Sequence, residues 1–198
     1  FAACAMKEWQ ERRDSEYTGF FDPEFIYDLR ENKPAAGMNA RNVMAILYKH
    51  GALTQVDKVI DNNTPEAASN YKIRGYAQVY DIKTLKKALY RNGPCLWAGP
   101  MYNKKSSKMW DIKTAHSEGN TEDHIHSAHA MAIVGYNDEG FILRNSFGAD
   151  WSDDGHCVFP YTDWRMKYEI WTCIDDPNTE DTNGITNCFA ACAAKCSQ

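Results

Sequence analysis

Two apolar segments joined by a short polar turn restrict the fold of this chain more than any other feature. Residues 129–136 (HAMAIVGY) and 141–145 (FILRN) flank the turn at 137–140 (NDEG). Apolar, β-branched segments on either side of a turn rich in Asn, Asp and Gly are typical of an antiparallel hairpin. Because two such strands place their far ends side by side, we expect His129 and Asn145 to be neighbours.

A histidine beside an asparagine is the arrangement that a cysteine nucleophile requires. The imidazolium stabilises the thiolate, and the asparagine carbonyl orients the ring by accepting a hydrogen bond from its second nitrogen. His129 and Asn145 therefore indicate half of a catalytic site. The competing interpretation is structural, with His129 as a hydrogen-bonded core residue and Asn145 as a turn residue.

The chain has a helical first half and a stranded second half. Residues 1–13 predict a helix whose apolar residues Phe1, Met6 and Trp9 should share the buried face. Three further helices are predicted after the capping residues Asp22, Asn39 and Asp81. Beyond residue 94, strands are predicted at 95–102, 129–136, 141–145, 156–161 and 168–174.

In two stretches the apolar residues show no regular spacing, so neither a helix nor a strand is clearly predicted. Residues 52–80 are mixed, with a short strand near 76–80, and residues 102–126 form a long polar loop. Helices followed by strands are the order of an α+β protein with segregated lobes. In such a protein the default ligand site is a crevice between the lobes.

Composition narrows the class of protein further. A chain of 198 residues with 43% hydrophobic residues can bury a globular core. The net charge of −5 and the lack of a basic stripe argue against nucleic acid as a partner. No apolar run reaches the length of about 18 residues that spans a bilayer, so we expect no membrane span.

Two separate motifs resemble those of the papain family of cysteine peptidases. Residues 129–136 are similar to the family's HAV-x-x-VGY strand, and residues 145–155 (NSFGADWSDDG) are similar to its NSWG-x-x-WG-x-x-G stretch. Residues 22–30 (DPEFIYDLR) resemble the SP-x-F-x-Y-x-x-R segment of the bacterial and large-virus branch. The resemblance implies a papain-like two-lobe α+β fold, with a helical N-terminal lobe and an antiparallel β C-terminal lobe. It also implies cysteine-type endopeptidase activity on peptide or protein substrates in the cleft between the lobes, without a cofactor.

The resemblance assigns roles to residues around the hairpin. His129 and Asn145 would be catalytic, while Phe147, in place of the family's usual Trp, and Trp151 would shield the pair from water. Ser152 replaces a usual glycine, which predicts a slightly different turn.

Two residues are implied in substrate binding. Gly37 falls near the glycines whose backbone pairs with an extended peptide. Ala130 would form a wall of the pocket for the second residue before the scissile bond, and its small side chain would leave that pocket open.

The nucleophile is expected outside the sequence. Residues 1–10 (FAACAMKEWQ) resemble the body of the helix that carries it, and alignment through Phe1 and Glu8 places the cysteine three residues before Phe1. The glutamine of the oxyanion hole would lie further upstream. Cys4 is the alternative nucleophile, but it requires a shift of one helical turn and loses the match at Glu8. We expect Cys4 to be a small buried core residue.

Other functions remain as alternatives. The chain could be an inactive pseudo-peptidase that serves as a structural or binding subunit of a larger assembly such as a virion. His124, His126 and His129 could bind zinc, although we expect loop histidines and no metal site.

Domain organisation and compartment follow from the ends of the chain and its cysteines. We expect one domain at 1–176, divided into lobes at 1–93 and 94–176, and a linker with a Cys-rich tail at 177–198. The tail cysteines would lie on one helical face and could contact a protein partner; they are Cys188, Cys192 and Cys196. Seven scattered cysteines favour an intracellular or virion location over secretion.

Overall fold

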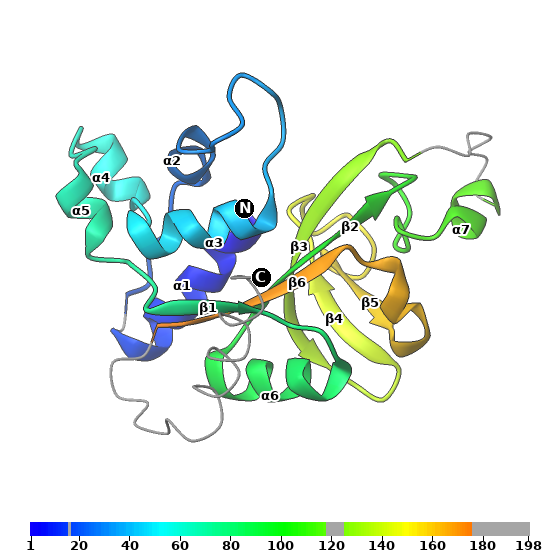
Figure 1. Ribbon diagram of the computed structural model, residues 1–198. Helices are drawn as coiled ribbons and strands as arrows, with labels where there is room; N and C mark the ends of the chain where they lie inside the picture. The colour runs from blue at the N-terminus through cyan, green and yellow to red at the C-terminus, as the bar shows by residue number, and fades with distance from the viewer. Residues whose placement is uncertain (16, 118–124, 176–198) are drawn as a thin grey trace, which may run out of the picture.

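The computed structural model describes residues 1–15, 17–117 and 125–175. The helices of residues 1–70 gather on one side of the molecule, and most of a twisted antiparallel sheet forms the other side (Figure 1). The helices are α1 (Ala2–Asp14), α2 (Pro23–Asp28), α3 (Ala40–Lys49), α4 (Gln55–Val59), α5 (Pro65–Ser69), α6 (Ile82–Asn92) and α7 (Ile112–Ser117), with a 3₁₀ helix at Tyr161–Met166. The strands are β1 (Gly75–Gln78), β2 (Cys95–Met101), β3 (Ser127–Tyr136), β4 (Gly140–Arg144), β5 (His156–Pro160) and β6 (Glu169–Ile174).

The predicted α+β class is confirmed. One sheet with the strand order β1-β6-β2-β3-β4-β5 runs through the molecule, and every neighbouring pair is antiparallel. The capped helices also begin where the sequence indicates. The side chain of Asn39 accepts a hydrogen bond from the Arg41 amide, and that of Asp81 accepts one from the Thr84 amide. These caps satisfy amide groups that a helix start leaves without a partner.

Helix α1 buries a different face from the predicted one. Met6 is fully buried, but Phe1 and Trp9 are 78% and 41% exposed. In their place the helix buries Lys7 and Gln10. Both polar side chains have partners in the second half of the chain, so the apolar pattern of the helix alone did not identify its buried face.

Two hydrophobic clusters form the core. The helical cluster includes Met6 and Met44, and it also takes Leu96 from β2 and Trp171 from β6. The sheet cluster takes Leu85 from α6. The cores therefore do not divide at residue 93: α6 packs with the sheet, while one face of the central strands packs with the helices. The expected tail at 177–198 lies outside the described residues.

The hairpin of β3 and β4 forms as predicted. The side chain of Asn137 accepts hydrogen bonds from the amides of Glu139 and Gly140, which closes the turn. The strand register shifts at a bulge between Ile133 and Gly135. Such a bulge increases the local twist and re-aims the residues that follow it.

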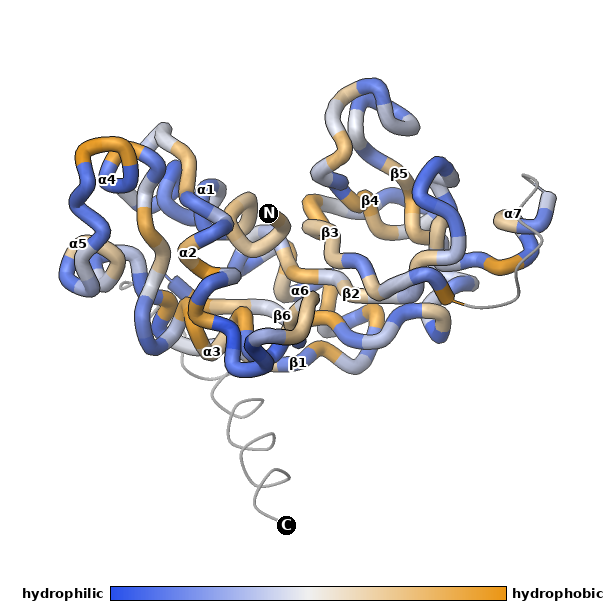
Figure 2. Tube along the Cα trace, turned by 90° about the horizontal axis from the view of Figure 1, so that it is seen from above, coloured by the Kyte–Doolittle hydropathy of each residue, from blue (hydrophilic) through white to orange (hydrophobic). Residues whose placement is uncertain are grey.

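The segment 52–80, which showed no clear period, contains two short helices, α4 and α5. Each begins after a threonine whose side chain caps it, Thr54 and Thr64. Val56 and Val59 of α4 and the following Ile60 are all exposed. Figure 2 colours part of this segment as hydrophobic. In the part of the chain that the structure describes, no helix is both long and apolar enough to cross a membrane.

Candidate active site

The hairpin brings His129 and Asn145 into direct contact. The His129 Nε2 atom lies 2.8 Å from the Asn145 Oδ1 atom, which also accepts a hydrogen bond from the Ser146 amide. A carbonyl oxygen can only accept, so Nε2 carries the hydrogen of this bond. The Nδ1 atom of the same ring is then the nitrogen available to a reacting group.

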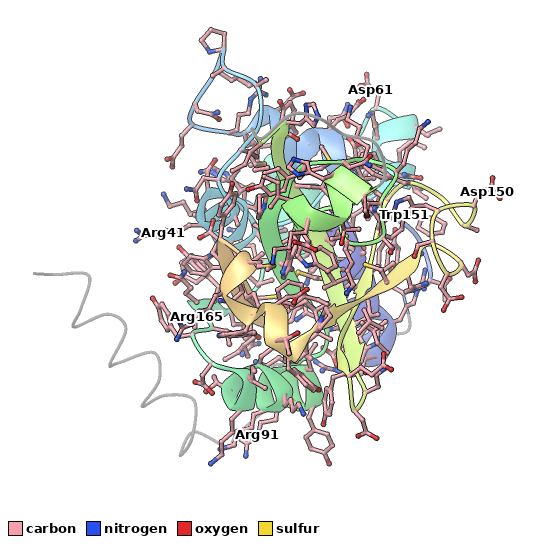
Figure 3. All side chains as sticks on the ribbon, turned by 90° about the vertical axis from the view of Figure 1, so that its right-hand side faces the viewer. Arg41, Asp61, Arg91, Asp150, Trp151 and Arg165 are labelled. Carbon is pink, nitrogen blue, oxygen red and sulfur yellow. The ribbon has the colours of Figure 1, made fainter. Side chains whose placement is uncertain are left out.

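Two aromatic rings pack behind this pair. The ring of Phe147 lies 5.0 Å from that of His129, and Trp151 meets Phe147 edge to face at 6.2 Å. Trp151 is 8% exposed, whereas Phe147 is 42% exposed. The adjacent Asp150 projects from the tip of the loop, and Trp151 turns inward (Figure 3). The two aromatic residues therefore occupy the positions from which a shield would act, Trp151 inside and Phe147 at the rim.

Burial is the main influence on the charge of His129. It lowers the pKa of the imidazole below its ordinary value of 6.5, because a charged ring loses solvation there. The hydrogen bond to Asn145 raises the pKa and so opposes this effect.

The loop after Asn145 depends on residues in the left-handed backbone region. Gly148 and Gly155 have φ angles of 90° and 78°, and Ser152 has a φ of 53°. This serine therefore adopts a conformation that glycine favours. The slightly different turn expected at Ser152 stays a prediction.

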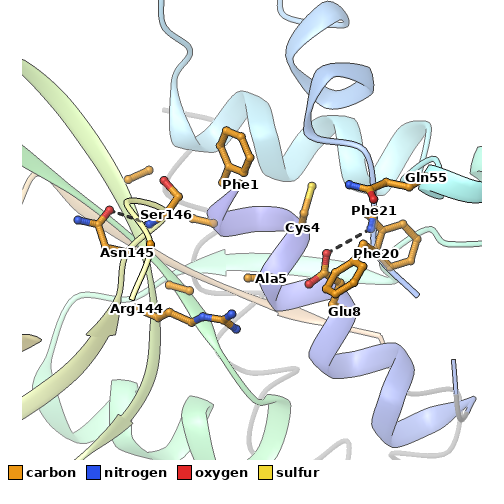
Figure 4. A pocket seen from close by; sticks show the side chains of 14 residues that line it. Phe1, Cys4, Ala5, Glu8, Phe20, Phe21, Gln55, Arg144, Asn145 and Ser146 are labelled. Carbon is orange, nitrogen blue, oxygen red and sulfur yellow. Dashed lines mark hydrogen bonds between the residues drawn. The ribbon is translucent and has the colours of Figure 1, made fainter. Parts of the chain in front are cut away.

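Two cavities lie beside the start of α1, and Phe1, Ala2 and Ala130 line both. The cavity next to Asn145, here the Asn145 cavity, has a volume of about 330 Å³ (Figure 4). The cavity next to His129, here the His129 cavity, has a volume of about 790 Å³.

Cys4 lines the Asn145 cavity but belongs to the helical core. It is 4% exposed, and Figure 4 shows it on the far side of Phe1 from Asn145. Burial raises the pKa of its thiol to about 12. The other described cysteines are also buried free thiols with raised pKa values, namely Cys95, Cys157 and Cys173. Each is therefore protonated at neutral pH and poorly suited to attack a carbonyl.

Gly37 lies in the loop between α2 and α3 with a φ of 79°. Its amide donates a hydrogen bond to the Tyr27 hydroxyl at 3.0 Å, and its carbonyl accepts one from the Asn32 side chain at 3.1 Å. Both backbone groups are thus engaged within the loop. Its assignment to substrate binding stays a prediction.

Only part of the alternative zinc site lies within the described residues. His126 and His129 are described, and His124 is not. Across residues 1–15, 17–117 and 125–175, no group of three or more His, Cys, Asp or Glu side chains is placed to hold a metal ion.

Sequence reasoning missed several residues around the cleft. Arg144 lines the Asn145 cavity, and Glu169 lines the His129 cavity. Glu169 begins the strand 169–174 (EIWTCI), in which polar and apolar residues do not alternate, so no local pattern assigns it to the cleft. Arg144 ends its strand and gives no such signal either.

Comparisons with known proteins identify the family and the fold. The model of the papain family cysteine proteases matches residues 29–170. Xylellain, a cysteine protease from Xylella fastidiosa, is 21% identical with a TM-score of 0.69, over 88% of this chain and 78% of that chain. A Carica candamarcensis cysteine protease solved with E-64, CMS1MS2, is 13% identical with a TM-score of 0.63, over 89% and 87%. The ragweed pollen allergen Amb a 11, a cysteine protease in its proform, is 16% identical with a TM-score of 0.63, over 89% and 59%.

At these identities the solved structures establish a papain-like fold. No curated protein matches the sequence. The family model, however, matches well over half of the chain. This chain therefore belongs to the papain family of cysteine proteases.

Proposed function

We propose that this chain forms the main part of a cysteine-type endopeptidase, in which His129 and Asn145 act together with a cysteine that precedes Phe1. The observation that carries the proposal is the 2.8 Å contact between His129 Nε2 and Asn145 Oδ1. It orients the imidazole and leaves Nδ1 for a thiol, as a Cys–His–Asn mechanism requires.

The start of α1 supports this position for the nucleophile. Phe1 lines both cavities, and His129 and Ala130 line one of them with it. Residues joined to Phe1 would therefore extend from the N-terminal end of a helix beside His129. The helix dipole favours a thiolate there, and an imidazolium favours it further.

The proposed reaction has two steps. The thiolate attacks the carbonyl carbon of the scissile bond, and His129 gives its proton to the leaving amine as the C–N bond breaks. This step leaves a thioester on the cysteine. His129 then takes a proton from water, the hydroxide adds to the thioester carbonyl, and the C–S bond breaks to release the acid and restore the thiolate. Asn145 holds the ring in position throughout, while Phe147 and Trp151 limit the access of water to the His129–Asn145 hydrogen bond.

The test is covalent labelling of the full-length protein by E-64, an epoxide inhibitor that reacts with activated thiols. We expect one adduct per molecule by mass spectrometry, on the cysteine three residues before Phe1. We expect His129→Ala to slow its formation by at least about 100-fold, because the imidazolium no longer stabilises the thiolate. Cys4→Ser is the matched control and should leave the labelling unchanged, since Cys4 is a buried residue of the helical core.

Labelling that is absent, or that proceeds equally well in the His129→Ala variant, would exclude the peptidase. A folded protein that fails in this way would instead support the inactive pseudo-peptidase, with the cleft as a binding surface. Labelling that moves to Cys4 would place the nucleophile one helical turn further along α1.

A further inference from the structure

The loop between α2 and α3 is tied to the end of α2 by two residues, Tyr27 and Arg30. This loop stands out from the helical side of the molecule (Figure 1). The central carbon of the Arg30 guanidinium lies 3.9 Å from the centre of the Tyr27 ring, a cation–π contact. The Nε and Nη1 atoms of Arg30 donate hydrogen bonds to the carbonyls of Ala35 and Tyr27 at 3.2 and 2.9 Å. Arg30 therefore fixes the tyrosine ring and the loop against each other.

The Tyr27 hydroxyl connects this loop with the His129 cavity. Its oxygen accepts a hydrogen bond of 3.0 Å from the Gly37 amide, and Tyr27 lines the cavity together with His129. A phenol hydroxyl has one hydrogen to donate in addition to its acceptor lone pairs. Within the ranges that the structure describes, no acceptor is recorded for that hydrogen. Because Tyr27 is 38% exposed, a ligand in the cavity can reach it.

The glycine of the loop does not offer a donor of its own at this point. Gly37 gives its amide hydrogen to Tyr27, and its carbonyl accepts a hydrogen bond from the Asn32 side chain. A hydroxyl that accepts a hydrogen bond is polarised and becomes a better donor. The donor at this part of the cavity wall is therefore the Tyr27 hydroxyl and not the Gly37 amide.

The rest of the cavity restricts what this hydrogen can meet. Its wall includes the apolar side chains of Val43, Leu96 and Ala98, which accept an aliphatic side chain of a ligand. Every residue of a peptide also brings a backbone carbonyl, which has to find a donor when it leaves water. The hydroxyl of Tyr27 is such a donor, and it does not depend on which side chain the ligand carries.

We propose that the Tyr27 hydroxyl positions the substrate by donating a hydrogen bond to a backbone carbonyl on the N-terminal side of the scissile bond. The inference rests on the proposed function and on the predicted place of Ala130, which lines the same cavity, on that side of the bond. The contact lies away from the reacting atoms, so it is equally strong in the bound substrate and in the transition state. Its loss therefore raises KM and leaves kcat unchanged.

The test replaces single atoms on both sides of this contact, in the full-length protein. The substrate is the coumarin amide of acetyl-Ala-Leu-Ala, with sulfur, a weak acceptor, in place of oxygen at one of the three carbonyls before the scissile one. We expect sulfur at one position to raise KM by about fivefold or more, with kcat unchanged. Tyr27→Phe should raise KM for the oxygen substrate to a similar extent and abolish the effect of sulfur at that position. Tyr90→Phe, at a tyrosine of α6 that is 87% exposed, should change neither.

Asn32→Ala separates the hydroxyl from the order of the loop. It removes the hydrogen bond to the Gly37 carbonyl and leaves the phenol in place, so the sulfur effect should persist. The inference would be overturned, while the peptidase activity stands, if sulfur had no effect at any of the three positions. It would also be overturned if Tyr27→Phe left the sulfur effect unchanged, or if Asn32→Ala abolished it.

If no peptide is cleaved, binding decides the matter separately. The acetyl-Ala-Leu-Ala amide and its three sulfur analogues would be titrated against the protein by calorimetry. Weaker binding of one sulfur analogue, with the difference lost in Tyr27→Phe, would support the inference. Equal affinities of all four peptides for the wild type would refute it.

Discussion

At the residue scale, the charge of His129 is set by opposing influences. Burial lowers its pKa, and the hydrogen bond to Asn145 raises it. Asn145 therefore both orients the imidazole and raises its pKa. An upstream thiolate would add a negative charge on the other side of the ring and raise the pKa further.

Replacing Asn145 should shift the titration of His129 in two directions. Asn145→Ala should lower the pKa, because the hydrogen bond to the charged ring is lost. Asn145→Asp should raise it, because a carboxylate favours the imidazolium. The Asn145 Nδ2 atom has no partner within the described part of the chain, so aspartate costs no hydrogen bond there. NMR titration of the His129 ring protons measures both shifts, with His156 as the internal reference.

The same lowered pKa gives stability a defined pH dependence. The folded protein binds this proton less readily than the unfolded chain does. The contribution of His129 to stability is therefore present above its ordinary pKa of 6.5 and is lost as the pH falls through the lower folded value. Equal titration of His129 in the wild type and in both Asn145 variants would contradict this account.

Much of the His129–Asn145 arrangement could be predicted, because both residues lie at the ends of one hairpin and the turn fixes their approach. The other residues that line the cleft could not be predicted in the same way. Glu169 reaches the cleft through pairing with Ala98, which lies 71 positions earlier in the sequence. Such long-range register is not encoded in any local motif.

At the element scale, the loop between β4 and β5 holds a serine in a backbone conformation that glycine favours. Ser152 has a φ of 53° in the left-handed region, which costs a residue with a side chain about 1 kcal/mol. The helices show which elements a local sequence pattern can predict. Asn39 and Asp81 head helices of ten or more residues with clear apolar faces and were predicted. Helix α4 has five residues, too few to display a period.

Relief of the strain at Ser152 should stabilise the protein. We expect Ser152→Gly to raise the free energy of unfolding by about 0.5–1 kcal/mol, since the gain in the folded state exceeds the added freedom of the unfolded chain. Gly155→Ala is the reverse substitution in the same loop and should have the opposite effect. Gly155 has a φ of 78°, and an added Cβ would lie 3.1 Å from the Gly148 carbonyl oxygen. It should lower stability by more than about 1 kcal/mol. Urea unfolding measures both, and a destabilised Ser152→Gly would show that the serine side chain has a role of its own.

At the scale of the whole molecule, a buried ionic contact joins the two ends of the described chain. Lys7 of α1 is 1% exposed and pairs with Glu11 at 2.6 Å and with Asp175, the residue after β6. A buried cation needs such partners because its loss of solvation is costly. The helix was predicted, but this contact joins residues 168 positions apart and could not be.

Breaking this contact should destabilise the whole protein. Lys7→Ala leaves two carboxylates buried without their cation, and we expect it to lower the free energy of unfolding by about 3–5 kcal/mol. Lys49→Ala, on the exposed surface of α3, is the control and should change it by less than about 0.5 kcal/mol. In a double-mutant cycle with Asp175→Ala, the combined loss should be smaller than the sum of the single losses. Additive losses measured by urea unfolding would show that the two residues are not coupled.

Strand β6 contributes both to the cleft and to the helical core. Glu169 faces the cleft, while Trp171 and Cys173 on the same face help to form the helical core. A substitution at Glu169 changes the wall of the His129 cavity, whereas a smaller residue at Trp171 or Cys173 leaves a void in the helical core. Variants of this one strand should therefore divide into those that alter the cleft and those that weaken the fold.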